Sequence, residues 1–541
     1  MHEDTASWAS ERRMREIERT PLPANVGALL DAAAAAHGER CFLDFFEDGE
    51  TLGFAETAGL TRRIAAGLAA AGIARGSHVG VMVPTSRLYP LAWLALARIG
   101  AVTVPINFGY TPRELAFTLR EAGVEFLIVH RDFLATLEEI DGGCPLPRAN
   151  VIVAGGPAGG YRHRFEDLAD ASPDAFRSGN AVTHRSLMNI QFTSGTTGFP
   201  KGAMQTQRFW LGFARVGAAQ FQDRPRRILV AQPLYYLDGQ WLLLMALTMG
   251  ATAFVARRMS AARFLEWLAR YRIEYCNFPE VVSKQPPAPG DRMDHLVVMS
   301  CYSHRKENYP AYERRFGGLA RQGFSMTEVG CGLYVPMEAG HMTGTGTVGI
   351  PVAFREAMVA REDGSPAAPG EAGELRFRGP GMTTGYYERP EATAAAFAGE
   401  WFRTGDVAMR DAEGWFYYLG RIKDLVRRSS ENISAVEVES VLRALPEVLE
   451  AAVLAVPDEL RGEEVKAYLK LAPDAPRDQA LLERVLAHCR DNLAAFKIPR
   501  YLELVDEFPR TSGLKIKKSA LREAKPDLRA DSYDRVEGVW R

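Results

Sequence analysis

Phe192-Thr193-Ser194-Gly195-Thr196-Thr197-Gly198-Phe199-Pro200-Lys201-Gly202 is the stretch on which the interpretation of this chain depends. Its glycines can turn backbone amides toward one point, and its hydroxyls and the Lys201 ammonium add further donors. Such a loop suits an anionic, oxygen-rich guest, and a polyphosphate is the natural one. The stretch is not a Walker phosphate loop, because no Gly-Lys pair follows a glycine after four intervening residues. On composition alone, a flexible surface loop is an equally good interpretation.

Length and composition limit the classes of protein. The 541 residues imply more than one domain, and 47% hydrophobic and 24% charged residues are typical of a soluble globular protein. The formal net charge of -2 provides no footprint for nucleic acid. The six cysteines form no CxxC pair, so neither a zinc site nor a disulfide framework is indicated. The polar start lacks a signal-peptide pattern, and the run from Leu91 to Ile106 is too short and interrupted to cross a bilayer. We expect a cytoplasmic protein without a membrane span.

Short apolar runs alternate with helical segments in the first part of the chain. Helices are expected at residues 26–38, 61–71, 91–99 and 112–122, and strands at 79–84, 101–105 and 126–129. Strands that alternate with helices predict a mostly parallel, layered α/β sheet. The Gly/Pro/Asp-rich segment 151–178 is expected to be a surface excursion.

A second type of pattern begins near Gly420 to Asp424. Helices are expected at 436–445 and 479–492, and strands at 451–456, 465–471 and 500–505, which makes an α+β module of about 115 residues. The basic tail from Lys515 to Lys525 is expected to be solvated. The fold class is therefore α/β, with a large N-terminal multi-subdomain layered domain (residues 1–421) and a small C-terminal α+β domain (residues 422–541).

The order Thr-Ser-Gly-Thr-Thr-Gly-x-Pro-Lys-Gly resembles the phosphate-binding signature of the adenylate-forming superfamily, which includes acyl- and aryl-CoA synthetases, peptide-synthetase adenylation domains and luciferases. The similarity covers most of the chain, because further segments match the family's motifs in the family's order. Parts of the chain, including Tyr236 to Gln240 and Tyr271 to Pro287, loosely resemble the carnitine/crotonobetaine–CoA ligase branch. The resemblance implies an AMP-forming ligase that uses ATP, Mg²⁺, CoA and a small carboxylic acid. A homodimer is left open.

The resemblance assigns nucleotide contacts in two segments. In the first, the ATP-binding residues are Thr193, Ser194, Gly195, Thr196, Thr197, Gly198 and Lys201. The second, Gly323-Phe324-Ser325-Met326-Thr327-Glu328, is similar to the family's Tyr-Gly-Met-Thr-Glu. It implies that Glu328 ligates Mg²⁺, a hard cation that prefers oxygen, and that Thr327 touches phosphate. Phe324, Ser325 and Met326 would lie along the nucleotide, with Ser325 also shortening the acid pocket. An isolated Thr-Glu pair would instead be a helix cap.

Two later segments complete the implied ATP chemistry. Trp401 to Asp406 is similar to the family's Trp-x-x-Thr-Gly-Asp, which implies that Asp406 accepts hydrogen bonds from both ribose hydroxyls. Tyr418 would pack near the nucleotide, and Arg421 would bond the ribose or a phosphate. Pro509 to Ile516 resembles the terminal Pro-Arg-Thr-x-x-Gly-Lys-Ile, which places the catalytic lysine at Lys515. Leu514 replaces the usual glycine, and the assignment rests on spacing because Lys517, Lys518 and Lys525 are also in the tail.

The acid and the thiol are less closely specified. Gln232 to Gly239 matches a family segment in which Tyr236 stands where histidine is common. The implied acid pocket comprises Tyr236, Leu237, Asp238, Trp241, Phe278, Tyr302 and Ser325, although core packing of the aromatics is an equally good interpretation. Aromatic lining suits an aryl or arylalkyl acid, and with Asp238 it also suits a quaternary ammonium group. An aliphatic acid is a further alternative.

Arg428 to Ser434 resembles the family's Arg-Gly-Gly-Glu-Asn-Ile, which flanks the CoA tunnel. Ser429 and Ser430 replace both glycines, and Glu431 follows them. Serines narrow backbone freedom, so an acceptor other than CoA stays open. Asp424 falls where the family has its inter-domain hinge, which implies that the small C-terminal domain is mobile.

The chemistry needs no protein nucleophile. Joining a carboxylate to AMP gives an anhydride with a good leaving group, and the attack on the α-phosphate needs charge neutralisation and in-line positioning. The competing interpretation is a dinucleotide oxidoreductase, because Gly344 to Gly349 matches GxGxxG. That motif should follow a strand and open a helix, whereas Pro351 follows almost at once. A non-catalytic binding module is disfavoured by the retained Lys201, Glu328, Asp406, Arg421 and Lys515.

Overall fold

The computed structural model describes residues 4–172, 182–193, 200–222, 224–302, 304–428, 431–459, 461–511 and 515–541. The chain divides into two units, Met1–Ala357 with Phe377–Phe402, and Met358–Arg376 with Arg403–Arg541. Within the described ranges, not one helix combines the length and apolar character that a bilayer crossing requires. The predicted division into an N-terminal domain (residues 1–421) and a mobile C-terminal domain (residues 422–541) stays a prediction.

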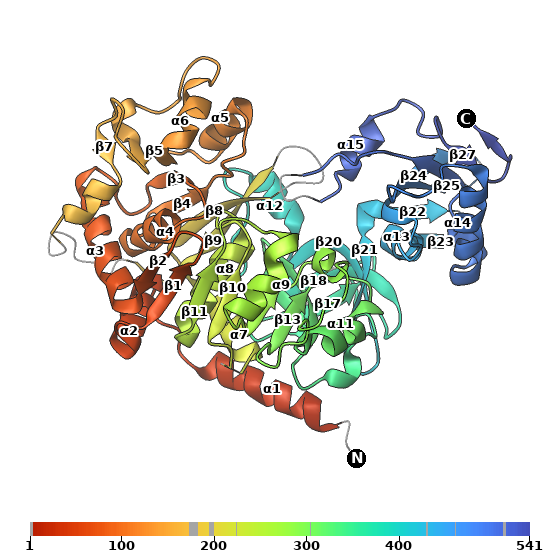
Figure 1. The fold of residues 1–541 in the computed structure, drawn as a ribbon, viewed down its shortest axis with the longest axis horizontal. Helices are drawn as coiled ribbons and strands as arrows, with labels where there is room; N and C mark the ends of the chain where they lie inside the picture. Colours follow the sequence, from red (N-terminus) through yellow and green to blue (C-terminus); the bar gives the residue numbers. More distant parts are fainter. Residues whose placement is uncertain are drawn as a thin grey trace. The chain divides into compact units, whose positions relative to one another are not determined.

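The first unit contains a seven-stranded sheet in the order β7-β6-β5-β3-β4-β8-β9 (Figure 1). Its strands are β3 (His78–Met82), β4 (Val102–Pro105), β5 (Phe126–His130), β6 (Val151–Ala154), β7 (His163–Arg164), β8 (Leu187–Thr193) and β9 (Lys201–Thr206). All neighbours are parallel except β8 and β9, which form an antiparallel pair. The nearby helices are α3 (Phe54–Ala70), α4 (Leu88–Ile99), α5 (Pro112–Glu121) and α6 (Leu134–Glu138).

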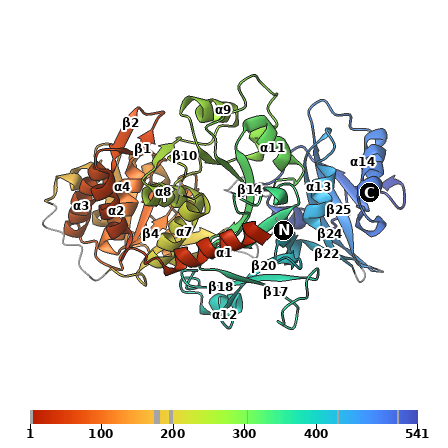
Figure 2. The same cartoon turned by 90° about the horizontal axis from the view of Figure 1, so that it is seen from below.

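A second sheet of the first unit runs in the order β16-β15-β14-β13-β12-β10-β11-β1-β2. Its strands are β1 (Cys41–Phe45), β2 (Glu50–Gly53), β10 (Arg227–Val230), β11 (Thr252–Val255), β12 (Tyr275–Asn277), β13 (Val298–Cys301), β14 (Leu319–Met326), β15 (Gly330–Tyr334) and β16 (Thr347–Pro351). Its helices include α2 (Val26–His37), α7 (Gln207–Gln220), α8 (Leu237–Met249), α9 (Ala261–Arg270), α10 (Glu280–Ser283) and α11 (Asn308–Phe316). The helix α1 (Asp4–Arg19) lies against α7, as Figure 2 shows, and Arg13 pairs with Glu338 at 2.9 Å.

The second unit holds a four-strand run, β17-β18-β20-β21, and a separate sheet in the order β23-β22-β25-β26-β27-β28, with β24 paired to β25. The four-strand run comprises β17 (Glu356–Ala360), β18 (Ala372–Arg378), β20 (Trp401–Arg410) and β21 (Phe416–Arg421). The separate sheet comprises β22 (Leu425–Arg428), β23 (Glu431–Ser434), β24 (Val448–Asp458), β25 (Gly462–Leu471), β26 (Tyr501–Leu504), β27 (Tyr533–Asp534) and β28 (Val539–Trp540). Helices α13 (Ala435–Leu442), α14 (Gln479–Asn492) and α15 (Lys518–Glu523) belong to this unit, and α12 (Pro390–Ala396) to the first.

Two local expectations were wrong. The segment 151–178 begins with β6, whose four residues are buried and pair in parallel with β5, so it is not a surface excursion at its start. Residues 173–178 lie outside the described ranges. The basic tail from Lys515 to Lys525 is not simply solvated, because it forms α15 and buries Leu521, and the chain after it ends in the β27–β28 hairpin.

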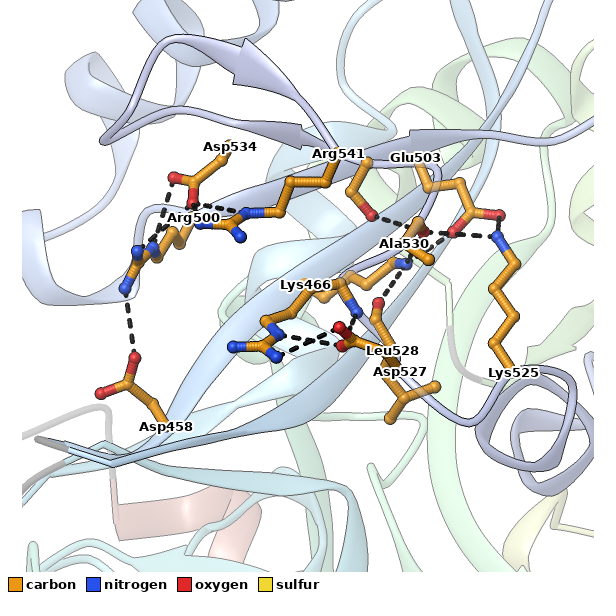
Figure 3. A network of polar contacts seen from close by, with 12 residues as sticks. Asp458, Lys466, Arg500, Glu503, Lys525, Asp527, Leu528, Ala530, Asp534 and Arg541 are labelled. Carbon is orange, nitrogen blue, oxygen red and sulfur yellow. Dashed lines mark hydrogen bonds and ion pairs between the residues drawn. The ribbon is translucent and has the colours of Figure 1, made fainter.

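A network of charged side chains fixes this tail to its sheet (Figure 3). Lys466 Nζ on β25 donates to Glu503 Oε2 on β26 at 2.5 Å and to the Leu528 carbonyl at 2.5 Å. Lys525 Nζ lies 2.7 Å from Glu503 Oε1, so one carboxylate holds two ammonium groups. Arg500 pairs with Asp534 in the hairpin at 3.2 Å. The end of the chain is therefore an integral part of the small sheet, to which it contributes β27 and β28.

Candidate active site

The phosphate-loop motif is built on the hairpin of β8 and β9. Thr193, the last residue of β8, is opposite Lys201, the first residue of β9. The Thr193 hydroxyl donates to the Lys201 carbonyl at 3.4 Å, and the Lys201 ammonium lies 5.1 Å from the ring centre of Tyr386. The predicted ligands between them, Ser194, Gly195, Thr196, Thr197 and Gly198, lie outside the described residues.

The Thr-Glu motif is the turn that joins β14 to β15. Gly330 follows it with a φ of +73°, a left-handed conformation that suits glycine. Glu328 is only 7% exposed, and its Oε1 accepts a hydrogen bond from the Tyr386 hydroxyl at 2.9 Å. Gln205, buried on β9, donates to the Thr327 carbonyl at 2.8 Å. The structure thus brings the phosphate-loop hairpin and the Thr-Glu turn into direct contact.

A third segment, residues 380–387, links these two motifs and was missed by the sequence reasoning. Tyr386 forms an antiparallel bridge with Ala203 of β9, and the Tyr387 N–H donates to the Gly202 carbonyl at 2.9 Å. On the other side, the Thr383 N–H donates to the Glu328 carbonyl at 2.7 Å. The available signal was the run Gly379-Pro380-Gly381-Met382-Thr383-Thr384-Gly385-Tyr386, whose glycines and threonines repeat the composition of the phosphate loop.

Arg355 is a second residue that the sequence reasoning missed. Its guanidinium donates to the carbonyl of Val329 at 2.6 Å and to those of Pro380 and Gly381 at 2.9 and 3.1 Å. Desolvation lowers the pKa of Arg355 to about 10, so the group stays charged at neutral pH. One cation therefore ties the residue after Glu328 to the start of the linking segment.

The donor set fits the implied metal ion. In the part of the chain that the structure describes, no group of three or more His, Cys, Asp or Glu side chains could hold a metal on its own. Mg²⁺ commonly takes one or two protein carboxylates and completes its shell with phosphate oxygens and water. Glu328 offers such a carboxylate at the turn beside the phosphate-loop hairpin.

Part of the predicted acid pocket comes together around Tyr302. Burial raises the pKa of the Tyr302 phenol well above its usual value, the charge of Asp238 raises it further, and a hydrogen bond with Ser325 lowers it. Tyr236 precedes α8, with its ring 4.6 Å from that of Tyr235, and Leu237 and Asp238 open the helix. Tyr302 and Ser325 are therefore in contact, and a Cβ atom at Gly323 of the same strand would lie 3.5 Å from Tyr302 Cε1.

Two other predicted pocket residues are engaged in core packing. Trp241 is buried, stacks on Phe213 at 4.9 Å and donates its indole N–H to the Phe213 carbonyl at 3.0 Å. Phe278 lies in a different cluster, 5.0 Å from Phe316. Phe324, expected along the adenine, stacks on Phe377 at 5.7 Å. The binding roles of Trp241, Phe278, Phe324 and Met326 stay predictions.

In the second unit, three predicted nucleotide residues form one cluster. Asp406 on β20 is opposite Arg421 on β21, and the Arg421 Nε lies 2.9 Å from Asp406 Oδ1. The Tyr418 hydroxyl donates to the same oxygen at 3.3 Å. Burial raises the pKa of Tyr418, and the Asp406 charge adds to the shift, so this phenol stays a donor at neutral pH. A buried carboxylate with an arginine and a tyrosine is a polar site that can receive hydroxyl donors.

The predicted hinge residue and the lysines of the basic tail differ in their contacts. Asp424 Oδ1 accepts from Arg522 at 2.8 Å. Lys515 is exposed, next to an antiparallel bridge between Arg510 and Ile516. Lys518 pairs with Glu439 at 2.6 Å, and Lys525 is in the network of Figure 3. Among the tail lysines, Lys515 and Lys517 are the exposed ones, which supports the assignment by spacing.

The predicted CoA segment is only partly described. Ser429 and Ser430 lie outside the described residues, and Glu431 begins β23. The competing GxGxxG interpretation is wrong, because Gly344 to Gly349 leads into the strand β16 and opens no helix.

Comparisons with known proteins agree with this geometry. A family model described as "AMP-binding enzyme" matches residues 30–387, and one described as "AMP-binding enzyme C-terminal domain" matches residues 437–515. The first match spans more than half of the chain, so the protein belongs to the AMP-binding enzymes. The resemblance to the adenylate-forming superfamily is thereby confirmed.

Particular relatives narrow the class. The crotonobetaine/carnitine–CoA ligase of Salmonella arizonae is 30% identical over 467 residues, covering 83% of this chain and 89% of the relative. The sulfoacetate–CoA ligase of Cupriavidus necator is 29% identical over 508 residues, covering 92% and 97%. The solved anthranilate CoA ligase AuaEII, in complex with anthranoyl-AMP, superposes with a TM-score of 0.83 and 25% identity, covering 94% and 98%. The predictions of the α/β fold class and of an AMP-forming acid–thiol ligase that uses ATP and CoA are confirmed.

Proposed function

We propose that this ligase activates an aromatic or arylalkyl carboxylic acid. The observation that carries the proposal is the half-buried ring of Tyr302, which hydrogen-bonds with Ser325 on β14 and lies 3.5 Å from the place of a Cβ atom at Gly323 on the same strand. An aromatic side chain offers a flat apolar wall to an aryl ring, and Ser325 is larger than the glycine usual in the family, which shortens the pocket. The likeness to the anthranilate CoA ligase supports the same class of acid.

A second candidate is a betaine, an acid that carries a quaternary ammonium group. Asp238 is an exposed carboxylate in the first turn of α8, and its charge reaches Tyr302. A cation next to a carboxylate and an aromatic face is stabilised by both. The 30% identity to a crotonobetaine/carnitine–CoA ligase supports this alternative.

The first half-reaction follows from the residues in named roles. An oxygen of the substrate carboxylate attacks the α-phosphorus of ATP, the bond from that phosphorus to the bridging oxygen breaks, and pyrophosphate leaves with acyl-AMP formed. Glu328 would hold Mg²⁺, which neutralises phosphate charge when bound. Lys201 and Thr327 would donate to the phosphates, Lys515 would stabilise the charge at the α-phosphate, and Asp406 would accept from the ribose hydroxyls.

In the second half-reaction the CoA thiol loses its proton to solvent, its sulfur forms a bond to the acyl carbon, and the bond from that carbon to the phosphate oxygen breaks, so that AMP leaves. We propose that residues 422–541 rotate about Asp424 between the two half-reactions, so that Lys515 serves the first and the Ser429–Ser430 segment serves the second. We also propose a cytoplasmic location, which is supported by six cysteines that form no disulfide. Light scattering would measure whether the protein forms a homodimer.

A panel of acids tests the choice of substrate. Benzoate, anthranilate, phenylacetate, carnitine, crotonobetaine and hexanoate are each incubated with ATP and Mg²⁺, and pyrophosphate is followed with and without CoA. We expect the highest kcat/KM for an aryl acid, and the proposal fails if an aliphatic acid is preferred. Asp238→Asn separates the two candidates, because removing the carboxylate should lower kcat/KM for a betaine and leave that for benzoate within about twofold.

A further inference from the structure

Tyr386 contacts both halves of the candidate phosphate site in the first unit. Its hydroxyl donates to Glu328 Oε1 at 2.9 Å, and its ring face lies 5.1 Å from the Lys201 ammonium. These two partners belong to different motifs and are 127 residues apart along the chain. One side chain therefore contacts the predicted metal ligand and a predicted phosphate ligand at once.

Backbone contacts hold Tyr386 in place independently of its side chain. It is bridged to Ala203, and its N–H donates to Thr393 Oγ1 at 2.9 Å. The preceding Gly385 has a φ of +123°, and a Cβ atom there would lie 2.4 Å from Thr393 Cγ2, so only glycine fits. The phenol is thus held on a rigid support, as a group that orients another side chain must be.

We propose that Tyr386 is a positioning residue for the metal-binding carboxylate of Glu328, an inference that rests on the proposed function. A carboxylate that ligates a cation keeps its orientation through hydrogen bonds from outer groups, and loss of such a group typically lowers metal affinity about 10- to 100-fold. The phenol is suited to this task because it donates one hydrogen bond without bringing a competing charge. Its ring also keeps the Lys201 ammonium over an aromatic face.

The test uses Tyr386→Phe, which removes the hydroxyl and retains the ring. With the acid that the panel identifies, the Mg²⁺ concentration for half-maximal pyrophosphate release should rise about tenfold, and kcat at saturating Mg²⁺ should stay within about twofold. A second measurement needs no turnover. Titration calorimetry of α,β-methylene-ATP with and without Mg²⁺ should show that the tightening of binding by Mg²⁺ falls by a similar factor.

Two controls separate positioning from general damage. Tyr387→Phe removes a hydroxyl from the adjacent ring, which packs on His78, and should leave the Mg²⁺ requirement unchanged. In a Glu328→Gln background, Tyr386→Phe should have no further effect on Mg²⁺-dependent nucleotide binding, because the group that it orients has been altered.

The inference is overturned if Tyr386→Phe has the Mg²⁺ requirement of the wild type, or if its effect persists in full in the Glu328→Gln background. A lower kcat at every Mg²⁺ concentration with an unchanged half-saturation point would also overturn it. If the wild-type protein releases no pyrophosphate with any acid, the proposed function fails, and the calorimetric comparison still decides the role of Tyr386.

Discussion

Asp406→Asn probes the ribose assignment because it keeps the shape of the side chain and removes its charge. The Asp406 side chain is 2% exposed, whereas that of its partner Arg421 is 37% exposed. Solvent screens an ion pair in which one partner is that exposed, so we expect a stability loss of about 1 kcal/mol. The variant should therefore fold, and its unfolding temperature should fall by only about 2–4 °C.

The effect on nucleotide binding should be larger. By the proposed function, Asp406 accepts hydrogen bonds from two ribose hydroxyls, and a bond to a charged acceptor contributes about 1.5–3 kcal/mol. Asparagine offers one acceptor oxygen and replaces the other with a donor, so at least one of the two bonds is lost. A loss of about 2 kcal/mol corresponds to a dissociation constant for ATP that is about 30-fold higher.

Titration calorimetry with ATP and with 2′,3′-dideoxy-ATP makes the prediction specific to the ribose. The wild-type protein should prefer ATP, and Asp406→Asn should lose about 30-fold of that preference. Asp411→Asn is the matched control, because Asp411 also accepts a tyrosine hydroxyl, from Tyr417 at 3.0 Å. The reasoning is refuted if Asp406→Asn keeps the full preference for ATP, or if the control loses it too.

Three further variants test other parts of the assignment. Lys515→Ala should abolish acyl-AMP formation and spare thioester formation from supplied acyl-AMP, while Lys517→Ala leaves both half-reactions intact; equal loss in both halves would indicate misassignment or damaged folding. Asp424→Pro fixes φ and should slow one half-reaction more than the other, whereas unchanged rates in both would remove the hinge from this position. Lys466→Met removes one of the two ammonium groups that pair with Glu503 and should lower the unfolding free energy of the second unit by about 2 kcal/mol. This loss is smaller than is usual when a buried ion pair is broken, because Lys525 still pairs with Glu503. An unchanged urea midpoint would contradict the last prediction.

Local patterns were enough to predict some of the regular elements, at residues 26–129 and 436–505. The helix α14 has the predicted bounds, Gln479–Asn492, because an Asp478 cap starts it and its apolar residues recur at helical spacing. The strand β6 was missed because its four apolar residues are followed by a Gly/Pro-rich stretch, and its identity depends on pairing with β5. The tail was misjudged because its lysines find carboxylates on β26 and α13, which are distant in sequence.

The candidate active site also contains some residues that were predicted from the sequence and others that were missed. The resemblance to the family's motifs, in the family's order, predicted the roles of Glu328, Asp406 and Arg421. Tyr386 and Arg355 were not predicted, since their roles follow from contacts with chain segments that fold back from elsewhere. Propensity and periodicity describe neighbours along the chain, and only the folded backbone reveals which carbonyls the Arg355 guanidinium reaches.

The anchoring on both sides of Lys515 has an entropic consequence. Arg510, before the lysine, forms an antiparallel bridge with Ile516, directly after it. Lys518, at the start of the following helix α15, pairs with Glu439. Ordering a free backbone costs about 1–2 kcal/mol for every residue, whereas ordering one lysine side chain costs at most about 2 kcal/mol. By the proposed function the Lys515 ammonium group engages a phosphate, and at Lys515 the loss of freedom would then be mainly that of its side-chain torsions, which would leave more of the interaction energy for the transition state.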